Sequence, residues 1–452
     1  MSFRKIFITV VLVTFFGCVK EETNQLSIDY EKYKLDNGLT IILHQDKSDP
    51  LVAISTIVHV GSNREKPGRT GFAHFFEHMA FTASENTPRG ANRLLIPTWG
   101  GSRNGGTSFD YTIYYEVVPK DALEKLMWID SDRLGFMINT VDAETLEGEI
   151  QVVKNEKRQR VDNQPYGHSS GIIQKALYPK GHPYSWSVIG ELEDLQAATI
   201  EDVKEFYNEF YGPSNATVVI AGDIEFDETK KLVERWFGEI KPNKNIIEKP
   251  EVRLVKLSET KKLYHLDKYA QLPQLSLTFP TVEQYSEDSY ALNTLGEILS
   301  DGRNSVFYKE IIEKQKLAPA ANAYNYSAEI SGQFQITVRA KPNTSLNDVH
   351  DAIMQALKNF EKNGVSDNDL KRIKAGQETG FYNSISTNLS KARQLGFYNE
   401  YAGDPGFVTK DIENILNVSK EDVMHVYNKY IKNQNSVILS VVPQSQPELI
   451  LD

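Results

Sequence analysis

The sequence predicts an α+β protein made of two homologous domains, each an α/β sandwich in which an antiparallel or mixed sheet is covered by helices. Strand-like and helix-like segments alternate through both halves of the 452-residue chain. A linker rich in Lys, Asn and Pro, residues 241–250, separates the halves. A short pattern also recurs: Glu-Asp-Val, Tyr-Asn and Asn within residues 201–215 return within 421–435 at a constant offset of 220, each time before a β-branched strand. The constant offset favours a duplicated domain.

The first half shows the hydrophobic patterns of a sheet with covering helices. Strand-like runs at 33–35 and 39–43 flank an Asn-Gly turn signal, and 51–60 is a β-branched run expected at the centre of the sheet. The later patterns predict a helix at about 69–84, one long strand over 102–118, helices at about 120–138 and 142–161, and a strand at 217–221. Asp142 suits the N-cap of the helix at 142–161, whose buried side would hold Leu146, Ile150 and Val153.

The N-terminus has the pattern of a targeting segment. Arg4 and Lys5 precede an apolar run, residues 6–16, that suits a secretory signal and is too short to cross a bilayer. Cys18 follows a glycine at the end of this run and is the only cysteine, which excludes an internal disulfide. We therefore expect a signal peptide at 1–17 and a bacterial lipoprotein acylated at Cys18, with a polar tether at 18–27. The alternative is an ordinary signal peptide with an incidental cysteine.

Acylation at Cys18 would anchor the protein to a membrane. The expected location is the cell envelope of a Gram-negative bacterium, at the outer membrane, on its periplasmic or surface face. Residues 19–22, Val-Lys-Glu-Glu, resemble a surface-export signal of such lipoproteins. The net charge of −11 makes a nucleic-acid partner unexpected, because phosphate binding needs a basic face.

A metal-binding motif lies in residues 71–79, Gly-Phe-Ala-His-Phe-Phe-Glu-His-Met. His74 and His78 stand four residues apart, so a helix would present both imidazoles on one face, within reach of one metal ion. Glu77 is placed to contact a water molecule at that metal. Two imidazoles and one carboxylate suit Zn²⁺ with an open fourth position. The alternative is a chance pattern on an amphipathic helix, whose aromatic residues would in either case pack on the sheet.

The missing carboxylate must come from another segment, and Glu156 is the best candidate. Glu149 and Glu156 are seven residues apart, two helical turns, so they share one face of the helix at 142–161. Both can point at the histidine helix if the two helices pack together. The alternative is that these are ordinary surface glutamates.

Several motifs occur in the order found in a known family. In chain order they are Gly61-Ser-Asn-Arg-Glu65, the histidine motif, Asn104 with Thr107, Asp110 with Thr112 and Tyr114, Glu149 with Glu156, and His182-Pro-Tyr-Ser-Trp186. From about residue 30 to the C-terminus the chain resembles the insulinase/pitrilysin family of inverted-motif zinc peptidases. It is most similar to the two-domain branch that includes mitochondrial processing peptidase. The resemblance implies a fold that forms half of a clam-shell.

The resemblance also implies a role for each matching residue. His74, His78 and Glu156 match the ligands of one Zn²⁺ per chain, and Glu77 matches the general base that takes a proton from the attacking water. Glu149 matches the acid that orients a ligand histidine. Asn104, with Gly105 beside it, falls where the family hydrogen-bonds the backbone of a peptide substrate that adds as a β-strand. Residues 28–245 would be the catalytic zinc domain and 251–452 a homologous non-catalytic domain, which contains no His-x-x-Glu-His.

The chain departs from the family pattern in two places. The family continues Asn-Ala-bulky-Thr, whereas this chain has Asn-Gly-Gly-Thr at 104–107, so we expect a larger or looser substrate pocket at Gly106. In many members the second domain of the opposing half supplies an Arg and a Tyr, seven residues apart, that hold substrate over the zinc. Ile312 and Pro319 stand at those positions, and neither side chain can donate a hydrogen bond.

The sequence therefore predicts a zinc-dependent endopeptidase that cleaves short or unfolded peptides. Because the Arg/Tyr pair is missing, we expect the zinc-bearing subunit of a heterodimer whose other subunit, a homologue, supplies that pair around a closed chamber. A homodimer with a weaker clamp is the alternative assembly. Two other functions compete: a catalytically silent peptide-binding or scaffold subunit of the same fold, and a metal-dependent hydrolase of non-peptide substrates.

Overall fold

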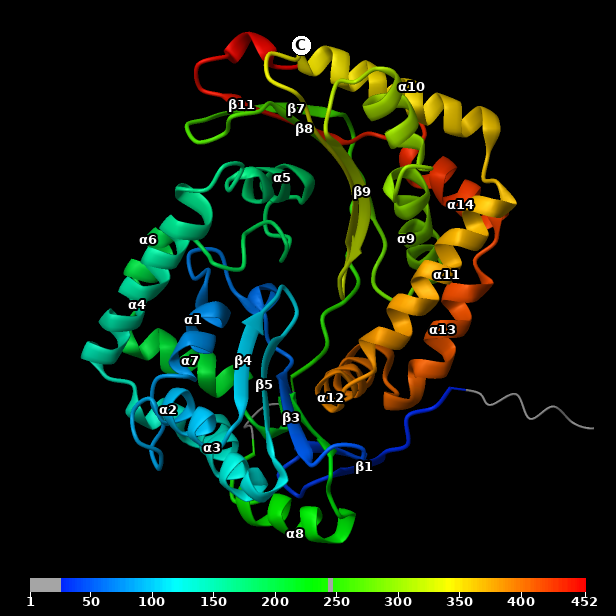
Figure 1. The fold of residues 1–452 in the computed structure, drawn as a ribbon. Coiled ribbons are helices and arrows are strands. Elements are labelled where there is room, and N and C mark those ends of the chain that lie inside the picture. Colours follow the sequence, from blue (N-terminus) through cyan, green and yellow to red (C-terminus); the bar gives the residue numbers. More distant parts are fainter. Residues whose placement is uncertain (1–25, 243–246) are drawn as a thin grey trace, which may run out of the picture.

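The computed structural model of the chain describes residues 26–242 and 247–452. The expected signal peptide, Cys18, most of the 18–27 tether and part of the linker at 241–250 lie outside the described residues. Each half of the chain forms one sheet, and helices surround both sheets (Figure 1). Among the described helices, none has the length and apolar character needed to cross a membrane.

The first sheet is mixed and has six strands. They are β1 (Glu31–Lys34), β2 (Thr40–Gln45), β3 (Leu51–Val58), β4 (Ser102–Thr107), β5 (Thr112–Pro119) and β6 (Ala216–Gly222). Their order is β1-β2-β6-β3-β5-β4, with β2 and β6 parallel and the other neighbours antiparallel. The predicted hairpin around the Asn-Gly turn is confirmed as β1–β2, and the strand predicted at 51–60 is β3, which has neighbours on both edges.

The second sheet repeats this topology. It consists of β7 (Lys261–Asp267), β8 (Gln274–Thr281), β9 (Ala320–Ser327), β10 (Gly332–Arg339) and β11 (Val437–Pro443). Its order, β7-β11-β8-β10-β9, matches β2-β6-β3-β5-β4, and its only parallel pair, β7 with β11, matches β2 with β6. The predicted fold class, two homologous domains of helix-covered sheets, is confirmed.

The repeated sequence pattern has the same structural role in both halves. α7 (Ile200–Phe210) begins with a capping box between Thr199 and Asp202, and α14 (Lys420–Val426) begins with one between Ser419 and Asp422. The repeated asparagine, at 215 and 435, donates its side-chain N–H to a backbone carbonyl in both halves.

The prediction of one long strand over 102–118 is wrong. Residues 108–111 form the turn that joins β4 to β5, which pair antiparallel. The hydroxyl oxygen of Ser108 accepts hydrogen bonds from the backbone N–H groups of Asp110 and Tyr111, and this stabilises the turn. A run rich in Thr and Tyr has high strand propensity on both sides, so hydrophobic pattern alone did not reveal the turn.

Helices of the first half cover one face of the first sheet. Besides α7 they are α1 (Phe72–Met79), α2 (Ala91–Thr98), α3 (Leu123–Phe136), α4 (Ala143–Lys157), α6 (Leu192–Gln196) and α8 (Phe226–Phe237). A further helix of the first half, α5 (Ser169–Leu177), lies on the second sheet instead. Asp142 caps α4 as predicted, since its carboxylate accepts the N–H of Thr145 at 2.8 Å. The predicted inner side of α4 is also confirmed, because Leu146, Ile150 and Val153 are all buried.

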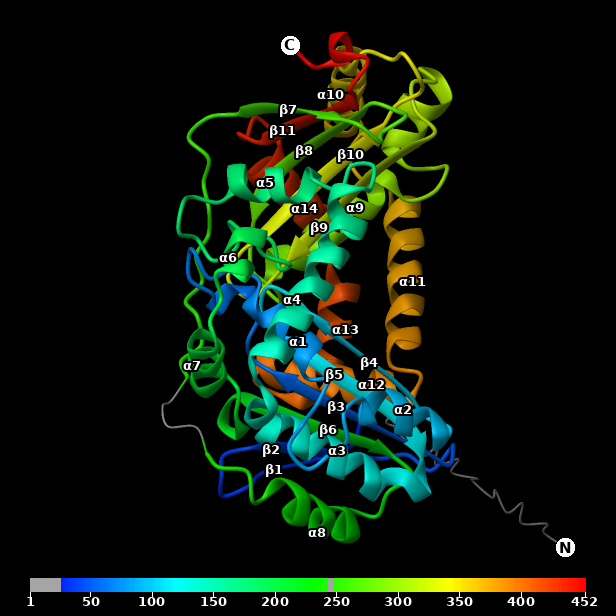
Figure 2. The ribbon, with the colours of Figure 1, turned by 90° about the vertical axis from the view of Figure 1, so that its left-hand side faces the viewer.

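Each half also covers the sheet of the other half. The second half adds α9 (Glu287–Ser300), α10 (Leu346–Asn363), α11 (Asp367–Ser384), α12 (Asn388–Phe397) and α13 (Val408–Asn417). α12 packs on β3 and β6 of the first sheet, and α5 packs on β8 and β11 of the second (Figure 1). Figure 2 shows α11 alongside the two halves, leading from the second towards α12 beneath it.

Candidate metal centre

The two histidines lie on α1, which has eight residues and is shorter than the predicted helix at 69–84. Gly71 precedes the helix with φ of +85°, in the left-handed region, so the helix cannot extend further towards the N-terminus. A side chain at Gly71 would also collide with the backbone, because its Cβ would lie 2.7 Å from the carbonyl oxygen of Ile189. The apolar residues of α1 are buried as expected: Phe72, Phe75, Phe76 and Met79.

The predicted ligand residues His74, His78 and Glu156 come together. Glu156 Oε2 lies 2.9 Å from His78 Nε2 and 3.6 Å from His74 Nε2. One ligand atom from each residue lies within 4.8 Å of the other two. His74 Nδ1 is buried and has no hydrogen-bond partner among the described residues. Two imidazoles and one carboxylate this close together fit a single zinc ion.

Glu149 lies beside the second nitrogen of His78. Glu149 Oε2 is 4.0 Å from His78 Nδ1, which is longer than a hydrogen bond. Its other oxygen accepts the Thr82 hydroxyl at 2.8 Å, and that hydroxyl also lies 3.2 Å from the carbonyl oxygen of His78. Glu149 is therefore on the correct side to orient His78.

The protonation states of His74 and Glu156 suit metal binding. Burial and, next to it, the neighbouring His78 lower the pKa of His74 to about 4, although Glu156 acts against this. Burial alone would lower the pKa of His78 too, but its hydrogen bond to Glu156 and the nearby carboxylates raise it. The pKa of Glu156 is lowered, first by that hydrogen bond. At neutral pH, His74 is thus neutral and Glu156 ionised, which are the forms that bind metals.

Glu77 points towards β4. Its Oε2 accepts the hydroxyl of Thr107 at 2.7 Å. Burial raises the pKa of Glu77, and the hydrogen bond from Thr107 acts against that rise. The sequence pattern predicted no role for Thr107, although this residue stands in one of the motifs that carry the family resemblance.

Asn104 and Gly105 lie on β4, the edge strand of the first sheet. β4 pairs only with β5 among the described strands, so its other edge is free to accept a further strand. The Asn104 side chain is exposed, and its oxygen accepts the N–H of Gly105 at 2.9 Å. A Cβ at Gly105 would lie 2.8 Å from the ring of Phe81, whereas a Cβ at Gly106 would meet nothing within 4 Å. The space expected beside Gly106 is present.

Ile312 and Pro319, which stand at the positions of the family's Arg/Tyr pair, lie in the second half. Ile312 is partly buried against the second core, in the helical segment 308–314. Pro319 is exposed immediately before β9. Neither contributes a polar side chain to the surface.

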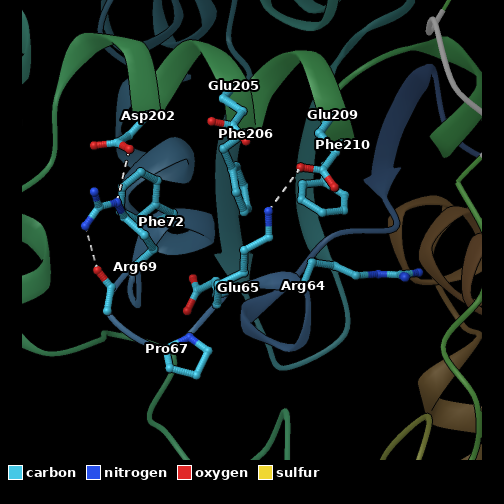
Figure 3. Close-up of a pocket in the computed structure, with 12 residues that line it drawn as sticks. Arg64, Glu65, Pro67, Arg69, Phe72, Asp202, Glu205, Phe206, Glu209 and Phe210 are labelled. Carbon is cyan, nitrogen blue, oxygen red and sulfur yellow. Dashed lines mark hydrogen bonds and ion pairs between the residues drawn. The ribbon is translucent and has the colours of Figure 1, made fainter. Parts of the chain in front are cut away.

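A cavity of about 360 Å³ lies beside the start of α1 (Figure 3). Phe72 of α1 and Phe206 and Phe210 of α7 line it, together with charged residues of the 64–69 segment and α7. Glu65 also lines it: this buried carboxylate accepts the N–H groups of Gly71 and Ala73, each at 2.9 Å. Burial raises the pKa of Glu65 to about 8, even though these two N–H groups act against the rise. In the sequence, Glu65 stood out only as the last residue of the Gly61–Glu65 motif.

Comparisons with known proteins agree with these features. A family model described as Insulinase (Peptidase family M16) matches residues 40–181, and one described as Peptidase M16 inactive domain matches residues 197–377. The zinc protease PqqE of Helicobacter pylori is 27% identical over 334 residues, which are 74% of this chain and 74% of that protein. The Schizosaccharomyces pombe protein named "Probable mitochondrial-processing peptidase subunit beta" is 28% identical over 216 residues, 47% of this chain and 46% of that protein.

Solved structures show the same fold. A protease from Helicobacter pylori matches with a TM-score of 0.86 at 25% identity and covers 92% of this chain and 100% of that chain. The periplasmic protease PqqL from Escherichia coli matches with a TM-score of 0.74 at 19% identity and covers 95% of this chain but 49% of PqqL. This chain therefore corresponds in fold to one half of that longer protein, consistent with half of a clam-shell. The chain belongs to the insulinase family, peptidase family M16, as a two-domain member similar to proteins named zinc proteases and mitochondrial-processing peptidase.

Proposed function

We propose that this protein is a zinc-dependent endopeptidase that cleaves short or unfolded peptides. The main support is the convergence of His74, His78 and Glu156, with the partly buried carboxyl group of Glu77 on the same helix as the two histidines. These three ligands would hold one Zn²⁺. When bound, the ion would supply Lewis acidity, which lowers the pKa of a water molecule and polarises a peptide carbonyl.

In this proposal Glu77 is the general base. Its carboxylate accepts a proton from the attacking water and returns it to the leaving amine. Because burial raises the pKa of Glu77 above its ordinary value, the carboxylate accepts a proton more readily than that of a solvent-exposed glutamate. Thr107 orients the carboxylate, and Glu149 lies beside the second nitrogen of His78, from where it would orient the imidazole.

The free edge of β4 would bind the substrate. An extended peptide that pairs with this edge gains backbone hydrogen bonds and lies next to Glu77, because Thr107 belongs to the same strand. Asn104, exposed on β4, would bind the peptide backbone, with Gly105 beside it. The open space at Gly106 would accept a bulky substrate side chain.

The missing Arg/Tyr pair and the N-terminal cysteine bear on the assembly and the location of the protein. We propose a heterodimer with a homologue that supplies an Arg/Tyr pair, because Ile312 and Pro319 cannot supply it; one relative is itself named as a subunit. A homodimer is the alternative. Acylation of Cys18 would attach the protein to the outer membrane of a Gram-negative cell envelope.

The deciding experiment is hydrolysis of quenched fluorescent peptides by the purified protein, alone and mixed with a homologue that carries the Arg/Tyr pair. We expect turnover that a chelator abolishes and added zinc restores. The Glu77→Gln variant should lose turnover by at least about 1,000-fold while it binds as much zinc as the wild type. Glu147→Gln, on the exposed side of α4, is the matched control and should retain full activity.

A catalytically silent peptide-binding subunit is the second candidate, favoured by the missing Arg/Tyr pair. It predicts zinc bound at one ion per chain and peptide binding, but no turnover in any mixture. Equal turnover of the protein alone and of the mixture would contradict the heterodimer and leave the peptidase standing.

A further inference from the structure

We propose that Glu65 is a positioning residue of the metal centre, which fixes the first turn of α1 and, through that turn, the imidazole of His74. The inference rests on the metal site of the proposed function. It concerns a carboxylate that contacts no predicted ligand side chain and that acts through the backbone.

The start of α1 has no local cap. The N-cap residue is Gly71, which has no side chain, and the first turn of α1 contains no acidic residue. The first N–H groups of a helix need acceptors from elsewhere, and a buried helix end without them is strongly unfavourable. Glu65, which is 6% exposed, provides both of its oxygens: one accepts from Gly71 and the other from Ala73, each at 2.9 Å.

His74 depends on this cap more than His78 does. His74 follows Ala73 directly, so the capped backbone turn carries its side chain. His78 has Glu156 at 2.9 Å on one nitrogen and Glu149 at 4.0 Å from the other. His74 has Glu156 at 3.6 Å on one nitrogen, and its Nδ1 has no partner among the described residues. The backbone therefore sets the direction of the His74 ring, in a helix of two turns that would be unstable by itself.

The segment that contains Glu65 is itself anchored. Arg69 pairs with Asp202 of α7 at 3.1 Å (Figure 3). Both the N–H and the hydroxyl of Thr70 donate to Asp194. Gly190 packs directly against Gly71. The carbonyl oxygen of Gly190 accepts a hydrogen bond from the ammonium group of Lys157, the neighbour of Glu156. The start of α1 and the end of α4 therefore both contact the segment at Gly190. Glu65 is the buried residue that ties the 65–71 segment to the histidine helix.

The test measures zinc affinity, by competition with a chromophoric chelator, in the full-length protein. Glu65→Gln keeps the shape of the side chain but places an amide NH₂ against a backbone N–H, and Glu65→Ala removes both acceptors. We expect zinc to bind both variants about 10- to 100-fold more weakly, as for other residues that support metal ligands. The electronic spectrum of the Co²⁺-substituted protein should also change, because the His74 ring moves.

Ser419→Ala is the matched control. It removes an equivalent helix cap at α14 in the second half, remote from the metal ligands. Urea unfolding of all three variants allows comparison at equal loss of stability. We expect Ser419→Ala to leave zinc affinity and the Co²⁺ spectrum unchanged.

Unchanged zinc affinity and Co²⁺ spectrum in Glu65→Gln and Glu65→Ala would overturn the inference. An equal loss of affinity in Ser419→Ala at the same loss of stability would overturn it too, because the effect would then be general destabilisation. A wild-type protein that binds no zinc would instead refute the proposed function on which the inference rests.

Discussion

Glu77 experiences two opposing influences: burial raises its pKa, and the hydroxyl of Thr107 lowers it by donating a hydrogen bond. The same hydrogen bond fixes the direction of the carboxylate. Thr107 comes from β4, so the strand proposed to bind substrate also orients the proposed base. The two functions are thus joined by one side chain.

Thr107→Val should impair catalysis without removing the metal. Valine has nearly the shape of threonine, and a hydrogen bond to a charged group contributes about 1.5–3 kcal/mol. We expect kcat for peptide hydrolysis to fall by about 10-fold or more, with KM and zinc content close to wild type. Steady-state kinetics and metal analysis would measure this.

Thr98→Val is the control, since the Thr98 hydroxyl donates only to the carbonyl oxygen of Leu95, at the end of α2. It should behave as wild type. A Thr107→Val enzyme with unaltered kcat would show that the hydrogen bond has no role in turnover.

At the scale of elements, β4 depends on two adjacent glycines that face different surroundings. Gly105 lies against Phe81, whose ring is packed between Arg103 and Tyr114. Gly106 faces open space. The pair allows the edge strand to pack closely on α1 and its following turn and still leave room on the other side.

These glycines give a matched pair of alanine substitutions. A Cβ at Gly105 would lie 2.8 Å from the Phe81 ring and 3.1 Å from the carbonyl oxygen of Ile113, so Gly105→Ala should destabilise the protein by about 1–3 kcal/mol. Gly106→Ala should change stability by less than about 0.5 kcal/mol. Urea unfolding measures both, and equal effects would mean that β4 can shift to make room.

Gly106→Leu tests the proposed pocket. The added side chain should keep the fold and reduce cleavage of peptides with bulky residues near the cleaved bond more than cleavage of peptides with small ones. Profiling with a peptide library would measure the change, and an unchanged profile would place the substrate elsewhere.

At the scale of the whole molecule, the two domains cover one another with equivalent helices. α5 and α12 occupy corresponding places, about 220 residues apart, and each packs on the other half's sheet at corresponding strands: β8 and β11 for α5, β3 and β6 for α12. The linker therefore separates the two halves in sequence, but each half still packs a helix on the sheet of the other. We infer that neither half would bury its sheet by itself.

Asp110 is a buried polar connection between the halves. Its Oδ1 accepts from Asn63 at 3.0 Å and from the hydroxyl of Tyr184 at 2.5 Å, and its Oδ2 accepts the backbone N–H of Glu329, in the second half, at 3.0 Å. Burial raises the pKa of Asp110 to about 6, although the bonds from Tyr184 and Glu329 lower it.

Asp110→Asn should reveal this connection through the pH dependence of stability. The folded protein holds the Asp110 proton up to about pH 6, whereas the unfolded chain releases it near the ordinary aspartate pKa of 3.8. The contribution of this proton to stability is full below about pH 4 and lost as the pH rises to 6, which amounts to at most about 3 kcal/mol. The variant lacks this titration.

We expect Asp110→Asn to be clearly less stable than wild type at pH 4, by at least about 1–3 kcal/mol, because its amide leaves the Glu329 N–H without an acceptor. The difference should shrink between pH 4 and 7. Urea unfolding at both pH values measures it, with Glu124→Gln, an exposed ion-pair variant, as control. A difference that does not depend on pH would contradict the raised pKa.

Features that depend on spacing along the chain could be predicted from the sequence. The His-x-x-Glu-His spacing placed His74 and His78 on one helix face, the seven-residue spacing placed Glu149 and Glu156 on another, and the 220-residue offset indicated duplication. Helical and strand periodicity fix such relations locally, so they do not require knowledge of the packing.

Contacts between distant segments were decided only by the tertiary structure. Four such contacts are the hydrogen bond from Thr107 to Glu77, the cap that Glu65 gives to α1, the packing of α5 and α12 on the opposite sheets, and the bonds of Asp110 between the halves. Each joins residues whose spacing along the chain follows neither the helical nor the strand repeat. Even the turn within 102–118 depends on how β4 and β5 pair. These contacts are set by how side chains pack and which of them become buried. Burial arises only in the folded molecule, when the two domains pack together.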